Sequence, residues 1–144
     1  MIKVGITGQK GFVGTHLFNY LGIQEDIERI PFEDDFFENN HQLQNFVRSC
    51  DAIVHLAAMN RHNDAEELYK TNISLVKQLI GACEATDSKP HILFSSSTQE
   101  ERDNPYGKSK FEGSQLLESW AEKNNAPFTG LVIPNVYGPF GYPY

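Results

Sequence analysis

Tyr106 and Lys110 are the two residues whose types and spacing could carry out proton-transfer chemistry. They lie four positions apart after Asn104-Pro105, a pair that predicts a helix start, so their side chains would share one helix face. A tyrosine hydroxyl has a pKa of about 10, too high for an effective acid or base near neutral pH, and a nearby ammonium lowers it. Such a pair could exchange a proton with a carbinol or ketone oxygen while a nicotinamide exchanges a hydride.

Three serines, Ser95-Ser96-Ser97, end an apolar segment and could hold the oxygen of the reacting group. The segment 91–95 is typical of a short buried strand, and parallel sheets bind ligands beyond the carboxyl ends of their strands. A Tyr-x-x-x-Lys spacing alone is a weak signal, because many solvated helix faces carry it. The serines and a glycine-rich loop in the same chain favour the catalytic interpretation.

The glycine-rich loop is Thr7-Gly8-x-x-Gly11-x-x-Gly14, between a predicted strand and a predicted helix. The first glycine would permit a tight turn, the second would let the backbone approach a pyrophosphate, and the third would let the helix pack closely on the strand. The amino end of the helix would face the phosphates with its N–H groups and its positive dipole end. The spacing differs from G-x-G-x-x-G, and an ordinary strand-to-helix turn is the alternative, but the context favours a dinucleotide site.

The choice between NAD and NADP stays open at this stage. An acidic residue about 20 positions after the loop usually holds the adenosine ribose. Glu33, Asp34 and Asp35 are available, although none lies clearly at a strand end, and solvated loop acids are the alternative. Arg29 could instead favour a 2′-phosphate. We therefore expect NADP or NAD as the cofactor.

Strand and helix patterns alternate along the chain, which predicts an α/β fold with a doubly wound parallel sheet of the Rossmann type. With 144 residues, the length suits one domain, so residues 1–144 are predicted to form a single dinucleotide-binding domain. Predicted strands span 3–7, 27–32, 51–58, 91–95 and 127–133, and predicted helices span 12–21, 42–48, 65–85 and 104–123.

Composition excludes several other classes of protein. Twelve basic against nineteen acidic residues give a net charge of −7, which argues against general nucleic-acid binding. No apolar run approaches the roughly 18 to 20 residues that cross a bilayer, and the amino-terminal residues show no signal-peptide pattern, so we expect no membrane partner and a cytoplasmic location. Cys50 and Cys83 are too few for a disulfide framework, His55 fits a buried core position, and no metal site is expected.

Taken together, these motifs resemble the extended short-chain dehydrogenase/reductase family, the NAD-dependent epimerase/dehydratase group that acts on nucleotide sugars. Within it, residues 55–61 and the short distance between the serines and Tyr106 resemble bacterial capsular-polysaccharide reductases, which reduce a UDP-linked 4-keto-6-deoxy amino sugar. The matching segments are 7–14, 51–58, Asn72, 95–97, 106–110 and 134–139.

The resemblance implies roles for the cofactor-binding residues. Gly8, Gly11 and Gly14 would line the pyrophosphate, and Asn72 would hold the active-site helix and its water. Pro134 would contact the carboxamide of the nicotinamide. The other implied cofactor contacts are the backbone of Phe12 and Val13 beside the pyrophosphate, Leu56, Ala57 and Ala58 beside the adenosine and ribose, and Ser96, Tyr106 and Lys110.

The resemblance also implies the catalytic set. Ser97 would be the catalytic serine, with Ser96 as the alternative. Tyr106 would donate a proton to the ketone oxygen, and Lys110 would lower the pKa of Tyr106 and bind the nicotinamide ribose. On the substrate side, Asn135 would face the sugar nucleotide and Arg61 could reach a phosphate, or be a solvated loop arginine.

The implied activity is an NAD(P)-dependent reduction of a UDP-4-keto-6-deoxy sugar in surface polysaccharide biosynthesis. Thr98-Gln99 stands where a dehydratase would carry Asp-Glu, which argues against dehydration, and Val132 replaces an arginine usual in the family. A nucleotide-sugar 4-epimerase and a non-catalytic dinucleotide-binding domain are the alternatives. Family members are longer, so we expect the substrate lobe to be missing here, with the cofactor site retained and full catalysis lost. The helices 65–85 and 104–123 either pack only on the sheet or also form a homodimer through a four-helix bundle.

Overall fold

The structure is a computed structural model that describes residues 1–58, 63–97 and 105–133. A sheet of five parallel strands, in the order β2-β1-β3-β4-β5, forms its centre. The chain runs outward from β1 in both directions, so the strand order reverses between β1 and β3, where ligands of such sheets bind. The strands are β1 (Ile2–Thr7), β2 (Ile27–Ile30), β3 (Ala52–His55), β4 (His91–Ser97) and β5 (Phe128–Ile133).

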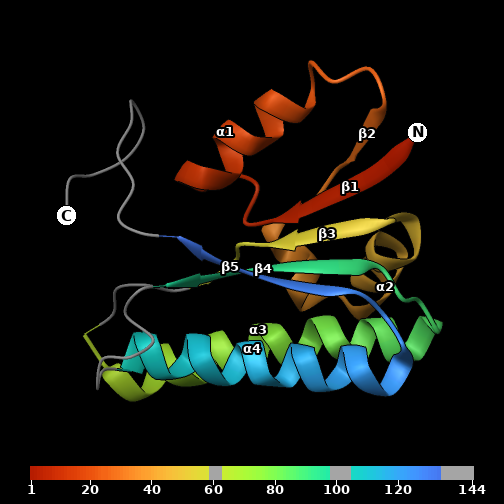
Figure 1. The fold of residues 1–144 in the computed structure, drawn as a ribbon. Helices are drawn as coiled ribbons and strands as arrows, with labels where there is room; N and C mark the ends of the chain where they lie inside the picture. Colours follow the sequence, from red (N-terminus) through yellow and green to blue (C-terminus); the bar gives the residue numbers. More distant parts are fainter. Residues whose placement is uncertain (59–62, 98–104, 134–144) are drawn as a thin grey trace.

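Helices cover both faces of the sheet, which confirms the doubly wound α/β prediction. Figure 1 shows α1 on one face and α3 and α4 side by side on the other. The core residues of α2 belong to the same cluster as those of α3, which places α2 on that second face. The helices are α1 (Phe12–Leu21), α2 (Asn40–Ser49), α3 (Ala65–Thr86) and α4 (Pro105–Asn124), with a short 3-10 helix η1 (Asp34–Glu38) before α2.

The two faces of β1 show how the sequence distributes the core. Val4 and Ile6 point toward α1 and pack with Leu21. Gly5, between them, faces α2, where a Cβ would lie 2.4 Å from the ring of Phe46. This alternation follows from the period of two of a strand, and it leaves the larger hydrophobic cluster between the sheet and helices α2, α3 and α4.

Several predicted boundaries were wrong by a few residues, for physical reasons. The strand predicted over 51–58 ends at His55, because the next two backbone N–H groups donate to the side chain of Thr7. The strand predicted over 27–32 ends before Pro31, which has no N–H to donate. The helix predicted from 42 begins at Asn40, since Asn39 caps it, and η1 was not predicted.

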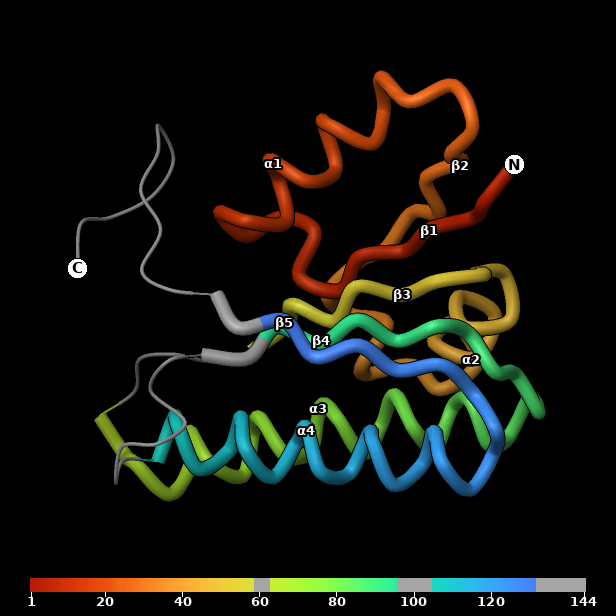
Figure 2. The backbone as a smooth tube through the Cα atoms, viewed as in Figure 1, coloured from red at the N-terminus to blue at the C-terminus, as the bar shows by residue number. Residues whose placement is uncertain are grey.

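All five strands point the same way, so their carboxyl ends gather at one edge of the sheet, as the tube in Figure 2 shows. The chain turns from β1 into α1 at this edge. Among the described helices, none combines the length and the apolar character that crossing a membrane requires.

Candidate functional site

The glycine loop joins β1 to α1 in a conformation that glycine makes possible. Gly8 has φ +71°, and a Cβ there would lie 3.0 Å from the backbone nitrogen of Ala57. A Cβ on Gly14 would lie 2.1 Å from the carbonyl oxygen of Gly8. The third glycine therefore lets α1 pack against the turn at Gly8 and Gln9, whereas the sequence interpretation placed that contact on the strand.

The amino end of α1 has the features that a pyrophosphate needs. The N-cap residue is Gly11, which has no side chain to cover the helix end, and the first turn contains no acidic residue. A Cβ on Gly11 would meet one atom within 4 Å, the Gly8 carbonyl oxygen, so the loop is open on its other side. Phe12 and Val13 occupy the first helical positions, whose N–H groups have no partner within a helix. These residues fit a dinucleotide phosphate.

The segment that follows β3 lies directly against this loop. The hydroxyl of Thr7 accepts hydrogen bonds from the backbone nitrogens of Leu56 and Ala57, at 3.0 and 3.1 Å. Leu56 and Ala57 are half-buried and Ala58 is exposed. The three residues assigned to the adenosine and ribose thus start beside Gly8, between β1 and β3, where the strand order reverses.

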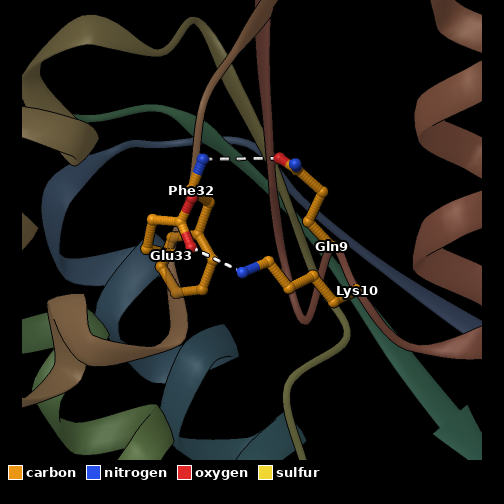
Figure 3. Close-up of polar contacts among 4 residues, drawn as sticks. All are labelled: Gln9, Lys10, Phe32 and Glu33. Atoms are coloured by element: carbon orange, nitrogen blue, oxygen red, sulfur yellow. Dashed lines mark hydrogen bonds and ion pairs between the residues drawn. The ribbon is translucent and has the colours of Figure 1, made fainter.

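The segment that follows β2 contacts two side chains of the same loop, Gln9 and Lys10, as Figure 3 shows. Gln9 accepts a hydrogen bond from the backbone nitrogen of Phe32, and the ammonium of Lys10 lies 2.8 Å from a carboxylate oxygen of Glu33. The hydrogen bond that Lys10 donates to Glu33 and the negative charge of Glu33 raise the pKa of Lys10. Among the three candidate acids, Glu33 is therefore the one that the glycine loop meets. Sequence reasoning left both Gln9 and Lys10 out of the site.

Arg29 lies elsewhere. Its guanidinium is 4.2 Å from the ring centre of Phe18 and donates to the carbonyl oxygen of the same residue, toward the carboxyl end of α1. The pyrophosphate would lie at the opposite end of that helix, whereas a 2′-phosphate would lie on the adenosine ribose. Binding of a 2′-phosphate by Arg29 stays a prediction.

The side chain of Lys110 is buried at the carboxyl end of β4. Its side chain is 3% exposed, and its ammonium donates to the carbonyl and the hydroxyl oxygens of Ser95, at 2.9 and 3.2 Å. The same nitrogen lies 4.8 Å from the ring centre of Phe94 and 5.8 Å from that of Tyr106. A buried ammonium needs such acceptors, because transferring a charge out of water without them is costly. The structure thus brings Tyr106 and Lys110 together on one helix face.

A chain of contacts from α3 holds the start of α4. The buried side chain of Asn72 donates to the hydroxyl of Ser109, which in turn donates to the carbonyl oxygen of Tyr106. Gly113 lets α4 approach both α3 and the sheet, since a Cβ there would lie 3.1 Å from Val76 of α3 and 3.2 Å from the ring of Phe94 in β4. Asn72 therefore contacts the helix that carries Tyr106, as its predicted role requires.

The remaining predicted residues fall outside what the structure describes. Ser96 and Ser97 belong to β4 by their backbone, which pairs with β5, but their side chains are outside the described atoms. Arg61, Pro134 and Asn135 lie outside the described residues. The catalytic serine and the substrate contacts therefore stay predictions.

Three buried titratable groups near or below the site are core residues, as expected. His55 is 1% exposed, and burial, followed by the charge of Lys110, lowers its pKa to about 3. Burial raises the pKa of both Cys50 and Cys83 to about 12. Over residues 1–58, 63–97 and 105–133, no group of three or more His, Cys, Asp or Glu side chains could hold a metal ion.

The chain belongs to the NAD dependent epimerase/dehydratase family, whose model matches residues 4–143. This membership confirms the family expected from the motifs and, with it, a nicotinamide dinucleotide as the cofactor class.

Individual relatives agree with this assignment. The chain is 35% identical over 142 residues to the UDP-2-acetamido-2,6-beta-L-arabino-hexul-4-ose reductase of Pseudomonas aeruginosa, covering 99% of this chain and 38% of that protein. The capsular polysaccharide assembling protein CapF from Staphylococcus aureus is 33% identical, with a TM-score of 0.77 over 99% of this chain and 38% of CapF. RMD from Pseudomonas aeruginosa, solved with NADPH, shares the fold at 22% identity, with a TM-score of 0.87 over 99% of this chain and 56% of RMD. The chain thus spans well under two thirds of the length of these relatives.

Proposed function

We propose that residues 1–144 form the dinucleotide-binding domain of an NAD(P)-dependent oxidoreductase that acts on a nucleotide sugar. The observation that carries this proposal is the buried ammonium of Lys110, held by Ser95 and 5.8 Å from the ring centre of Tyr106. A buried cation beside a tyrosine favours the phenolate form and so brings the hydroxyl into a useful pKa range. The glycine loop lies at the same edge of the sheet.

In this proposal each group has a definite task. Gly8, Gly11 and Gly14, with the backbone of Phe12 and Val13, hold the pyrophosphate, and the residues after β3 hold the adenosine end. The nicotinamide, when bound, supplies the hydride. Tyr106 gives its proton to the ketone oxygen, Lys110 stabilises the phenolate that remains and binds the ribose, and Ser97, or Ser96, holds the same oxygen.

For the substrate, we propose a UDP-linked 4-keto-6-deoxy sugar used in surface polysaccharide biosynthesis. The names of the reductase from Pseudomonas aeruginosa and of CapF support this choice, because both proteins are at least 33% identical to the chain. Arg61 and Asn135 would face the nucleotide sugar, and Pro134 would touch the nicotinamide. Both the substrate and the cofactor are water-soluble nucleotides, which favours a cytoplasmic location.

The test is a titration followed by an assay. The chain is titrated with NADH and NADPH by calorimetry, and oxidation of each is then followed with a UDP-4-keto-6-deoxy sugar. Binding with turnover that Tyr106→Phe abolishes supports the reductase. Conversion of a UDP-sugar without net oxidation of cofactor favours the 4-epimerase, and binding without turnover supports a dinucleotide-binding domain that does not catalyse the reaction alone. Failure to bind either dinucleotide contradicts all three.

We also propose that a second copy of the chain packs on α3 and α4 to form a four-helix bundle. These helices leave a groove of about 780 Å³ on their outer side, which a helix pair of another copy would fill. Sedimentation of the wild type against Leu116→Glu tests this, and a monomer at all concentrations contradicts it. The groove is lined by Tyr69, Lys70, Ile73, Ser74, Lys77, Gln78, Glu112, Gln115, Leu116 and Ser119.

A further inference from the structure

Thr7 and His55 form a buried polar pair directly under the glycine loop. They are opposite residues in the ladder between β1 and β3, and their exposed fractions are 0% and 1%. The hydroxyl oxygen of Thr7 lies 2.7 Å from Nδ1 of His55. A polar pair in such a place contacts neither solvent nor a ligand, so its role has to be sought in what it holds.

The hydrogen-bond inventory of Thr7 determines which ring nitrogen of His55 carries a proton. A hydroxyl has one hydrogen to donate and two lone pairs to accept with. The backbone nitrogens of Leu56 and Ala57 donate to this oxygen, at 3.0 and 3.1 Å, and occupy both lone pairs. The single hydrogen therefore goes to Nδ1 of His55, which must be unprotonated, and the neutral ring carries its hydrogen on Nε2.

The surroundings of His55 keep the ring neutral and in place. Its ring stacks on Phe94 with centres 5.7 Å apart and planes 16° apart. The Ser95 hydroxyl donates to the carbonyl oxygen of His55 at 3.4 Å, and Ser95 also holds the ammonium of Lys110. A cation so close disfavours a second positive charge on the ring. His55 thus stays an acceptor for Thr7 over the pH range in which such an enzyme would work.

What the pair holds is the chain segment that faces the first glycine. Backbone atoms of Leu56 and Ala57 lie so close to Gly8 that a Cβ there would be 3.0 to 3.1 Å from them. The N–H of Leu56 also donates to the carbonyl oxygen of Thr7, whereas Ala57 depends on the hydroxyl. The position of Ala57 against the glycine turn is therefore set by one side-chain oxygen.

We propose that Thr7 and His55 are positioning residues for the adenosine end of the dinucleotide. The neutral His55 ring orients the Thr7 hydroxyl, and this hydroxyl fixes the backbone of Leu56 and Ala57 against the glycine turn before the cofactor arrives. The inference rests on the proposed function of the loop, since it assigns these two residues to the same site. Neither of them touches the cofactor.

The test compares two changes at one position, one that removes the hydroxyl and one that keeps it. Thr7→Val keeps the shape and removes the hydroxyl, whereas Thr7→Ser keeps the hydroxyl. We expect Thr7→Val to weaken NADH binding, measured by calorimetry on the 144-residue chain, by about tenfold, because a largely desolvated N–H loses its acceptor. Thr7→Ser should bind within about twofold of the wild type. His55→Phe keeps the stacking on Phe94, removes the acceptor, and should weaken binding in the same direction.

A spectroscopic measurement tests the orientation independently of any variant. In a long-range ¹H–¹⁵N NMR spectrum of the wild-type chain, Nδ1 of His55 should show the shift of an unprotonated nitrogen and Nε2 that of a protonated one, unchanged from pH 5 to 8. A protonated Nδ1 overturns the inference even if Thr7→Val does not fold. Equal NADH affinity of wild type and folded Thr7→Val overturns it as well. A wild type that binds no dinucleotide refutes the proposed function instead, which separates the two failures.

Discussion

Replacing Lys110 with methionine should separate the chemistry of this residue from its effect on stability. The ammonium is buried, and its acceptors on Ser95 are uncharged. Methionine has a similar length and volume and carries no charge. Removing the cation therefore leaves no unpaired charge among these contacts. We expect Lys110→Met to fold with a free energy of unfolding within about 1.5 kcal/mol of the wild type.

The expected magnitude follows from two opposing sets of energies. Hydrogen bonds from a charged donor contribute about 1.5–3 kcal/mol each, and two are made to Ser95. The ammonium over the ring of Phe94, at 4.8 Å, adds about 1 kcal/mol. Against these, burying an ammonium costs several kcal/mol, which methionine does not incur. The two sets are of similar size, so their difference is small.

The assay is urea unfolding of the chain followed by circular dichroism, with Lys108→Met as the control. Lys108 is exposed on the same helix, so the control makes the same chemical change without burial. A loss of more than about 3 kcal/mol in Lys110→Met would show that the lysine is a structural anchor and refute the reasoning. Where the chain turns over substrate, Lys110→Met should lower kcat by about 10²–10⁴-fold and Lys108→Met should leave it unchanged.

Three further predictions concern the loop and the ring beneath it. Gly14→Ala places a Cβ 2.1 Å from the Gly8 carbonyl oxygen, so it should lose about 1–3 kcal/mol in urea unfolding, and an unchanged midpoint would contradict the packing described. Glu33→Gln frees the charge of Lys10, and calorimetry should show affinity for NADPH rising about threefold relative to NADH. Because burial lowers the pKa of His55 to about 3 from its ordinary value of about 6.5, the unfolded chain binds one more proton than the folded chain between these pH values. Stability should therefore fall on acidification from pH 6.5, by up to about 1.4 kcal/mol per pH unit, and His55→Phe should flatten this dependence.

The parts of the site that the sequence predicted are those that local spacing determines. Tyr106 and Lys110 share a face because they are four residues apart on a helix, and Pro105 begins that helix. The glycine loop could be recognised because its three glycines lie within seven residues, two of them between β1 and α1 and the third in the first turn of α1. The helical spacing of apolar residues, which is also local, predicted the carboxyl end of helix α3 within one residue.

The contacts that were missed join residues far apart in the chain. Lys10 and Glu33 are 23 positions apart, and Thr7 and His55 are 48 apart. Whether such residues meet depends on which strands pair and in which register, and a single sequence does not give the register. The early end of β3 has the same origin, because the segment after His55 is apolar enough for a strand but its N–H groups are taken by a side chain of β1.

Ser95 shows how local sequence spacing and contacts between distant residues combine in the candidate site. Sequence reasoning looked for the catalytic hydroxyl in the serine run, at Ser97 or Ser96, and gave Ser95 no role of its own. In the structure both oxygens of Ser95 accept hydrogen bonds from Lys110. The same hydroxyl donates to the carbonyl oxygen of His55, whose ring orients Thr7. Ser95 thus links Lys110 of α4 to His55 at the end of β3, and His55 contacts Thr7, the last residue of β1 before the glycine loop. In a parallel sheet such links can form wherever neighbouring strands end at one edge, because the last residues of paired strands lie side by side there.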